Sequence, residues 1–124
     1  MSTVLIVEDE RDVLEVVQDA LERRGLRVRT AANDEGAYAI LDREARDLNV
    51  LIADINLGYG TTGFDVARRA RQLHPELQVV YITGHAAHLD RFGVPDALMF
   101  PKPFYPDELA DKVMAIIENR AASG

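Results

Sequence analysis

Five polar residues stand where short apolar runs end. Glu8 and Asp9 follow the run at 4–7, Asp54 closes the run at 50–53, Thr83 follows 79–82, and Lys102 follows 97–100. If these runs are parallel strands, their carboxyl ends meet at one edge of a sheet, where open α/β sheets place their chemistry. Three carboxylates there would repel one another, and a hard cation such as Mg²⁺ would relieve that repulsion. A hydroxyl and a mobile ammonium suit phosphoryl oxygens, so the pattern predicts a site where Asp54 is the nucleophile that accepts a phosphoryl group.

Each of these residues also has an ordinary structural explanation. Aspartate often caps turns, so Asp54 alone proves little. The acidic run at 8–10 is typical of a solvated helix start, where it complements the helix dipole. The prediction therefore rests on the joint placement of the residues at the ends of four strands.

Composition limits the class of protein. The chain has 124 residues, no cysteine and a net charge of −7, which fits a single domain over residues 1–124 without disulfides or thiolate metal sites. An acidic balance disfavours a nucleic-acid surface. The apolar run at 4–7 is followed at once by three acidic residues, so it is no signal peptide, and no run approaches the roughly 20 residues that span a bilayer. We expect a soluble, cytoplasmic protein that contacts neither nucleic acid nor membrane.

Strand patterns and helix patterns alternate along the whole chain. Strands are expected at 3–7, 26–31, 49–54, 78–82 and 97–100. Helices are expected between and after them. Apolar stripes define the first helix (Val13, Val16, Val17, Ala20 and Leu21), the second (Ala37, Ile40 and Leu41) and the last (Leu109, Val113, Ile116 and Ile117). The third helix is expected at 64–73, and the fourth has at most about two turns within 86–92. Gly25 is expected to end the first helix, Asn33 or Asp34 to cap the second, and Pro106 to begin the last. The tail at 121–124 is expected to fray.

This alternation predicts an α/β fold. Right-handed crossovers between parallel strands put helices on both faces of the sheet. The expected architecture is a flavodoxin-like (βα)5 doubly wound sheet with strand order 2-1-3-4-5, in which strands 1, 3 and 4 surround the switch point.

Taken together, the motifs resemble the response-regulator receiver domain of two-component signalling, the CheY-like family. The resemblance covers all of the chain except the tail and is carried by VLIVEDE at 4–10, LIADINL at 51–57, GFDVARRAR at 63–71, VVYITG at 79–84 and FPKPF at 100–104. As an ordered set with these intervals, the motifs are highly specific.

The resemblance implies a role for each site residue. Asp54 would be the phosphoacceptor, and Glu8 and Asp9 the acidic pair around Mg²⁺, with Mn²⁺ as an alternative ion. Asn56 would lend its backbone carbonyl to the metal. Thr83 would follow the phosphoryl group and Lys102 would pair with it, and the Lys102–Pro103 bond is expected to be cis, as in the family.

Some positions depart from the family pattern. The loop after Asp54 has Gly58 where a proline is usual and is one residue longer, and its glycines should make it more mobile. The interval between Thr83 and Lys102 is short, so the fourth helix is expected to be truncated. The usual switch aromatic is replaced by Met99, while Phe100 should point to the opposite face. His85 is a candidate for tuning the lifetime of the aspartyl phosphate, or an exposed histidine without a role.

The expected function is that of a phosphorylation-dependent switch, not an enzyme acting on a separate substrate. Its partners would be a sensor histidine kinase or histidine phosphotransfer protein and an unknown downstream protein, contacted through the fourth helix, fifth strand and last helix. We expect a stand-alone receiver, monomeric or weakly dimeric, although excision from a larger protein remains an alternative.

Other classes fit less well. A haloacid-dehalogenase-type phosphatase needs a second aspartate where Asn56 stands. A flavodoxin would need a Ser/Thr-rich phosphate loop after the first strand, and a nucleotide-binding domain would need a glycine-rich fingerprint after some strand. A degenerate receiver that binds partners without phosphorylation is the third alternative, and the intact Asp9, Asp54, Thr83 and Lys102 weigh against it.

Overall fold

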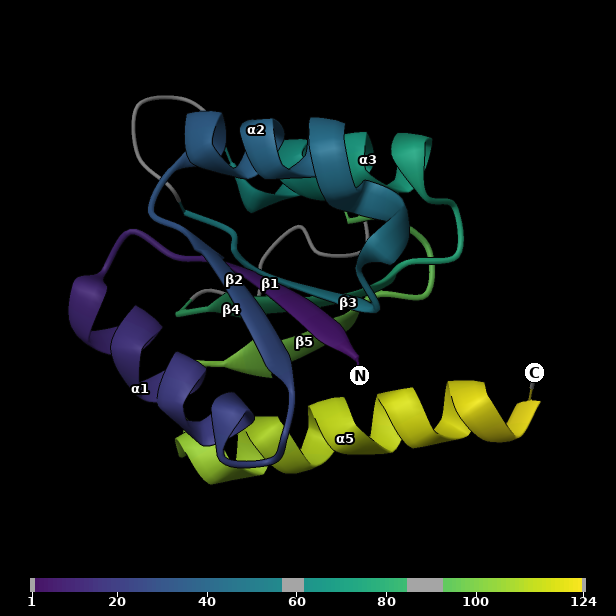
Figure 1. Cartoon of the computed structure of the whole chain (residues 1–124). Helices are drawn as coiled ribbons and strands as arrows, with labels where there is room; N and C mark the ends of the chain where they lie inside the picture. Colours follow the sequence, from purple (N-terminus) through teal and green to yellow (C-terminus); the bar gives the residue numbers. More distant parts are fainter. Residues whose placement is uncertain (1, 57–61, 85–92, 124) are drawn as a thin grey trace.

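One parallel sheet organises the chain in the computed structural model, which describes residues 2–56, 62–84 and 93–123 (Figure 1). The strands are β1 (Thr3–Val7), β2 (Arg27–Ala31), β3 (Val50–Asp54), β4 (Gln78–Thr83) and β5 (Leu98–Pro101). They pair in parallel in the order β2-β1-β3-β4-β5. This confirms the predicted strand order, and it places the ends of β1, β3 and β4 side by side.

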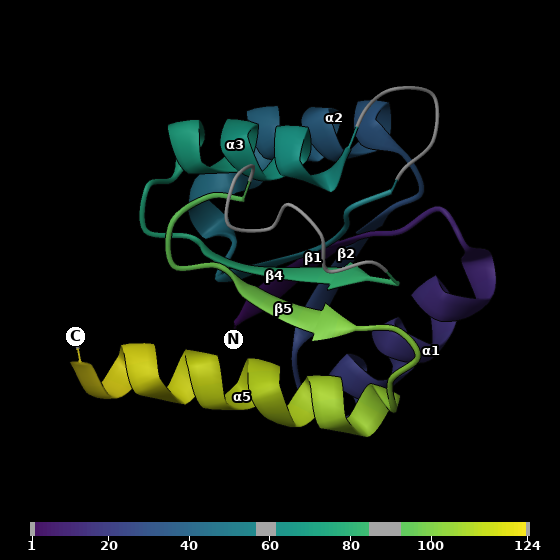
Figure 2. The same cartoon turned by 180° about the vertical axis from the view of Figure 1, so that it is seen from behind.

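Helices cover both faces of the sheet. The described helices are α1 (Arg11–Glu22), α2 (Asp34–Glu44), α3 (Gly63–Leu73) and α5 (Pro106–Ser123), with a short 3-10 turn at Ala45–Asp47. Figures 1 and 2 show α2 and α3 on one face and α1 and α5 on the other. The helix expected within 86–92 lies outside the described residues. No helix in the described part of the chain is long and apolar enough to cross a membrane.

Local signals explain where the helices begin and end. Asn33 caps α2, because its side chain accepts a hydrogen bond from the Gly36 N–H at 2.8 Å. Thr62 and Asp65 form a reciprocal capping box that starts α3 at Gly63, one residue before the predicted start. After α1 the chain turns at Gly25, whose φ of 84° lies in the left-handed region that glycine adopts without strain.

Two apolar cores lie against the two faces of the sheet. All five residues of β1 and of β3 are buried, as expected for central parallel strands. Alternate residues of these strands point to opposite faces, so Leu5 packs with α2 and α3 while Ile6 packs with α1 and α5. In the central strands β1 and β3, polar side chains therefore occur only at the strand ends.

The structure differs from the sequence prediction at one residue of α1. Val16 was expected on the buried stripe of α1, but it is 49% exposed, because it lies about 100° around the helix from the buried Val17. The last helix, α5, extends to Ser123, and fraying of the tail at 121–124 stays a prediction.

The two adjacent valines of α1 allow a matched test of this packing. Val17→Ala should lower the free energy of unfolding by about 1–3 kcal/mol, because it leaves a cavity between α1 and the sheet. Val16→Ala, at the exposed neighbour, should change it by about 0.5 kcal/mol or less. Urea unfolding followed by circular dichroism measures both values. Equal losses from the two variants would contradict this orientation of α1.

Candidate functional site

Three ionisable side chains from three strand ends converge at the carboxyl edge of the sheet. Glu8 follows β1, Asp54 is the last residue of β3, and Lys102 follows β5. The Lys102 Nζ donates hydrogen bonds to Glu8 Oε1 and to Asp54 Oδ2, both at 2.9 Å. Residues separated by up to 94 positions thus form one cluster, as the sequence analysis expected of these three.

Lys102 is also held through its backbone. Its N–H donates to the Thr83 carbonyl oxygen at 2.7 Å, which ties it to the end of β4. The Lys102–Pro103 peptide bond is cis, as expected. The rings of Phe100 and Phe104 meet edge to face on either side of it, with centroids 5.5 Å apart. The lysine therefore leaves the sheet in a fixed direction, toward Asp54.

Glu8 is the most strongly perturbed group in the site. Its side chain is fully buried, and its Oε2 has no hydrogen-bond partner among the described residues. Burial and the neighbouring Asp54 raise the pKa of Glu8 to about 8, and Lys102 only partly opposes this. One lysine cannot balance two buried carboxylates, so the pocket disfavours a second negative charge.

The pKa of Lys102 is raised as well. Burial acts to lower it, but the hydrogen bonds to Asp54 and Glu8 outweigh burial. The ammonium form of Lys102 is thus favoured at neutral pH. The site consists of a fixed positive charge beside a carboxylate at the end of β3.

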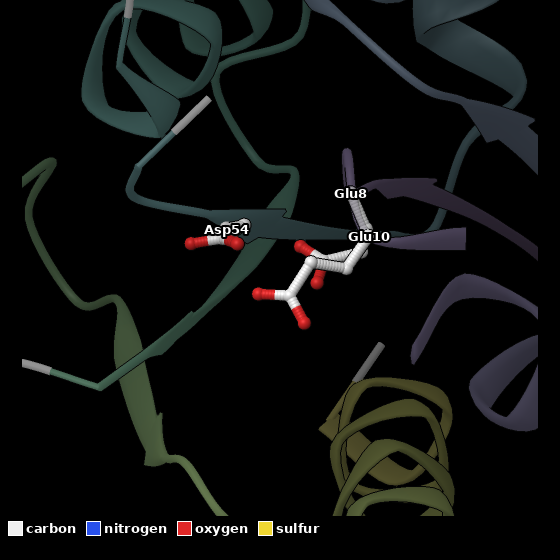
Figure 3. A group of neighbouring side chains, drawn as sticks. All are labelled: Glu8, Glu10 and Asp54. Carbon is white, nitrogen blue, oxygen red and sulfur yellow. The ribbon is translucent and has the colours of Figure 1, made fainter. Parts of the chain in front are cut away.

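The carboxylate oxygens of Glu8, Glu10 and Asp54 lie within 4.8 Å of one another, close enough to share one metal ion. Figure 3 shows Glu8 and Glu10, from the chain after β1, lying beside Asp54. Carboxylate oxygens are ligands that suit a hard cation such as Mg²⁺. Glu8 Oε2 has no hydrogen-bond partner among the described residues, so it is available as a metal ligand. The residues present therefore fit a magnesium site.

Glu8, Asp9 and Asp54 are the acidic ligands expected from the sequence. In the structure Asp9 is exposed and lies outside this group, whereas Glu10 belongs to it. Glu10 also lies 3.5 Å from Lys102 Nζ through its Oε1. The signal that could have identified Glu10 is the run of three acidic residues at 8–10, whose alternate members point the same way if the extended strand conformation continues.

Backbone groups hold Asp54 from its other side. The Asn56 N–H donates to Asp54 Oδ1 at 2.9 Å, and Asn56 forms an isolated antiparallel bridge with Thr62. Gly63 packs directly on the acceptor strand, because a Cβ on it would fall 2.2 Å from the Asp54 carbonyl oxygen. The sequence places this glycine at the start of the motif at 63–71, and its close approach to β3 is visible only in the folded chain. Gly58 lies outside the described residues.

Of the remaining predicted positions, Thr83 lies on β4 and Met99 lies on β5. Thr83 is 4% exposed at the end of β4. Met99 is half-buried and pairs in register with Tyr81, which points to the α2 and α3 face. Phe100 packs on the α1 and α5 face, so the two β5 residues point in opposite directions, as predicted. His85 lies outside the described residues.

A family model described as the response regulator receiver domain matches residues 4–114. The chain belongs to this family. Receiver domains of two-component systems are phosphorylation-dependent switches, and the acidic pocket at the end of β3 agrees with a phosphoacceptor role.

Proteins that resemble this receiver differ in their length. It is 32% identical to the response regulator receiver protein CpdR of Brucella abortus over 116 residues, which cover 91% of this chain and 94% of CpdR. It is 30% identical to the transcriptional regulatory protein CpxR of Klebsiella pneumoniae over 122 residues, which cover 94% of this chain. The receiver spans only 50% of that protein's length.

Solved receiver structures share the fold throughout. A response regulator receiver protein from Sinorhizobium medicae superposes with a TM-score of 0.87 at 30% identity, covering 96% of each chain. The response regulator TrrA of Thermotoga maritima, solved in complex with Mg²⁺ and BeF, superposes with a TM-score of 0.79 at 26% identity. That match covers 94% of this chain and 99% of TrrA.

The contact between Gly63 and Asp54 predicts a strict size limit at this glycine. Gly63→Ala should lower the free energy of unfolding by about 1–3 kcal/mol, because its methyl group would push the start of α3 away from β3. Gly84→Ala is the matched control, since a Cβ at Gly84 meets no atom of the described residues within 4 Å. We expect the control to change stability by about 0.5 kcal/mol or less. Denaturant unfolding compares the two, and a harmless Gly63→Ala would contradict the close approach.

The raised pKa of Glu8 predicts how stability depends on pH without metal. Between the ordinary value of 4.5 and about 8, the folded protein binds a proton that the unfolded chain does not. The free energy of unfolding should therefore fall as pH rises through this window, by roughly 2–4 kcal/mol. Glu8→Gln cannot ionise, so it should flatten this dependence and be more stable than the wild type at the upper end.

Urea unfolding in EDTA at about pH 5 and about pH 8 tests this expectation. Glu10→Gln, at an exposed position 64% accessible, serves as the control and should keep the wild-type slope. If wild type and Glu8→Gln lost the same stability over this window, the buried Glu8 would not be the group responsible.

Proposed function

We propose that this receiver accepts a phosphoryl group on Asp54, with Mg²⁺, from a sensor histidine kinase or a histidine phosphotransfer protein. The observation that carries the proposal is the double hydrogen bond of Lys102 Nζ to Glu8 and Asp54 at 2.9 Å. This pair of hydrogen bonds holds the Lys102 ammonium group against Asp54, the carboxylate at the end of the central strand β3. We further propose that the modified protein signals by contact with another protein.

The side chains have distinct roles in this transfer. One Asp54 Oδ attacks the phosphorus of the phosphohistidine, the P–N bond breaks, and the imidazole leaves with the bonding electrons. Asp54 Oδ1 is oriented by the Asn56 N–H, which leaves Oδ2, now held by Lys102, facing the pocket. Lys102 can pass from the carboxylate to the incoming phosphoryl oxygens and keep their charge balanced.

A metal ion would complete the charge balance. When bound, Mg²⁺ would neutralise the phosphoryl oxygens and the acidic side chains together. Glu8, Glu10 and Asp54 could hold it with their carboxylates, and we keep Asp9 and the backbone carbonyl of Asn56 as further proposed ligands. The Mg²⁺ and BeF bound by the related TrrA support this assignment. Mn²⁺ has the same preference for oxygen ligands and is a suitable substitute.

Thr83 connects the acceptor to the rest of β4. Its side chain is buried beside the pocket, and its carbonyl oxygen accepts the Lys102 N–H. We propose that the Thr83 hydroxyl moves toward the phosphoryl group, and that His85 tunes the lifetime of the phosphate. The output surface would be formed by β5, α5 and the segment before β5, with Met99 responding through its packing.

The first experiment measures phosphorylation directly. Incubation with acetyl phosphate and Mg²⁺ should add a single phosphoryl group to the intact protein, as seen by mass spectrometry. EDTA should abolish the adduct, because the acidic pocket then lacks its cation. Asp54→Asn should also abolish it while keeping the wild-type circular dichroism spectrum, because an amide is not a nucleophile.

Asp42→Asn is the matched control, because Asp42 is exposed on α2 and pairs only with Arg69 among the described contacts. This variant should label like the wild type. A fully labelled Asp54→Asn would refute the assignment of the acceptor. No adduct on the wild type, from acetyl phosphate or from phosphohistidine donors, would refute the function itself.

A further inference from the structure

A buried tyrosine spans from β4 to the chain that leads into β5. Tyr81 lies in the middle of β4 with no exposed surface, and its hydroxyl accepts a hydrogen bond from the Val94 N–H at 3.0 Å. Val94 itself packs against the core on this face. A buried hydroxyl that loses its partner is costly, so this contact fixes where residues 93–97 lie.

The ring of Tyr81 is in contact with the segment that supports the acceptor. It meets Phe64 edge to face, with ring centroids 5.0 Å apart and an interplanar angle of 71°. Phe64 follows Gly63, the residue packed against the Asp54 carbonyl. A continuous series of packed groups therefore runs from Asp54 through the start of α3 to Tyr81 and Val94.

A second series of contacts runs along the strand ends. Thr83 lies two residues beyond Tyr81 on β4, and its carbonyl oxygen accepts the Lys102 N–H. Lys102 in turn binds Asp54. The β5 segment is thus tied to β4 before it begins, through Val94, and after it ends, through Lys102.

The strand β5, which lies between the hydrogen bonds of Val94 and Lys102 to β4, is well placed to move. β5 has only four residues, lies at an edge of the sheet, and none of its residues is fully buried. Leu98 is 37% exposed. Short exposed edge elements with few buried contacts have the lowest local stability in a fold. A change at Asp54 that shifts Lys102 would therefore act on β5, and the tie at Val94 would have to adjust.

We propose that Tyr81 is a positioning residue that couples Asp54 to residues 93–97 through the hydrogen bond from Val94 to its hydroxyl. This inference rests on the proposed phosphorylation of Asp54. In register, Tyr81 is the β4 neighbour of Met99, so an aromatic residue with a hydroxyl lies beside the position where the switch aromatic is missing. The coupling is then carried from β4 and not from β5.

Hydrogen exchange followed by NMR tests the coupling with two backbone reporters. The Asn56 N–H, bonded to Asp54, reports occupation of the acceptor site, and the Val94 N–H reports the far end of the path. Beryllium fluoride with Mg²⁺ serves as a stable phosphoryl mimic. In the wild type we expect both amides to respond, with a change of about fivefold or more in Val94 exchange.

Tyr81→Phe keeps the ring and removes only the hydroxyl. Val94 exchange in the free protein should accelerate by about five- to tenfold. The Asn56 amide should still respond to the mimic, whereas the Val94 amide should not. Tyr105→Phe, at a tyrosine that is 73% exposed, should behave like the wild type at both reporters. Thermal unfolding verifies that each variant is folded.

The outcomes separate the two proposals. If the wild-type Asn56 amide does not respond, the acceptor function fails and this inference fails with it. If Asn56 responds but Val94 does not, the coupling alone is overturned. If Val94 keeps its full response in Tyr81→Phe, the hydroxyl is merely structural and the proposal is wrong. Phe64→Leu, which removes the edge-to-face contact, should weaken the Val94 response and provides a second variant.

Discussion

The hydrogen bonds of one lysine to two carboxylates hold the functional edge of this receiver together. Lys102 binds both Glu8 and Asp54, and its own backbone is tied to β4. Because Glu8 is fully buried with one unpartnered oxygen, the cluster contains more acidic groups than its single lysine can balance. The site is therefore prepared to receive a cation, and the rest of the fold holds these groups close together.

Rigid packing beneath the site makes this possible. The fully buried strands β1 and β3 fix the directions in which Glu8 and Asp54 leave the sheet. Gly63 lets the start of α3 approach the Asp54 backbone, and the capping box of Thr62 and Asp65 fixes that start. The acceptor thus has the start of α3 on one side and the acidic side chains of Glu8 and Glu10 on the other. Packing of this kind holds the acceptor carboxylate in a defined position.

The edge strand β5 differs from the central strands in this respect. It is short and partly exposed, yet Lys102 follows it directly. Lys102 therefore connects Asp54 directly to a partly exposed edge strand. Tyr81, buried in the adjacent strand, ties the chain before β5 to the same core that supports the acceptor. A fully buried centre and a partly exposed edge are combined within one sheet.

The sheet and most of the strand-end cluster could be predicted from the order of residues alone. Uninterrupted apolar runs specify central strands, their alternation with helices specifies the order, and Asp54 and Lys102 follow as strand-end residues. Which acidic neighbours face Asp54 was decided only by tertiary structure, because the direction of Glu10 depends on how the chain leaves β1. The same holds for the Gly63 contact and the bond between Tyr81 and Val94. These join groups from separate elements, and no local pattern encodes the distance between two packed elements.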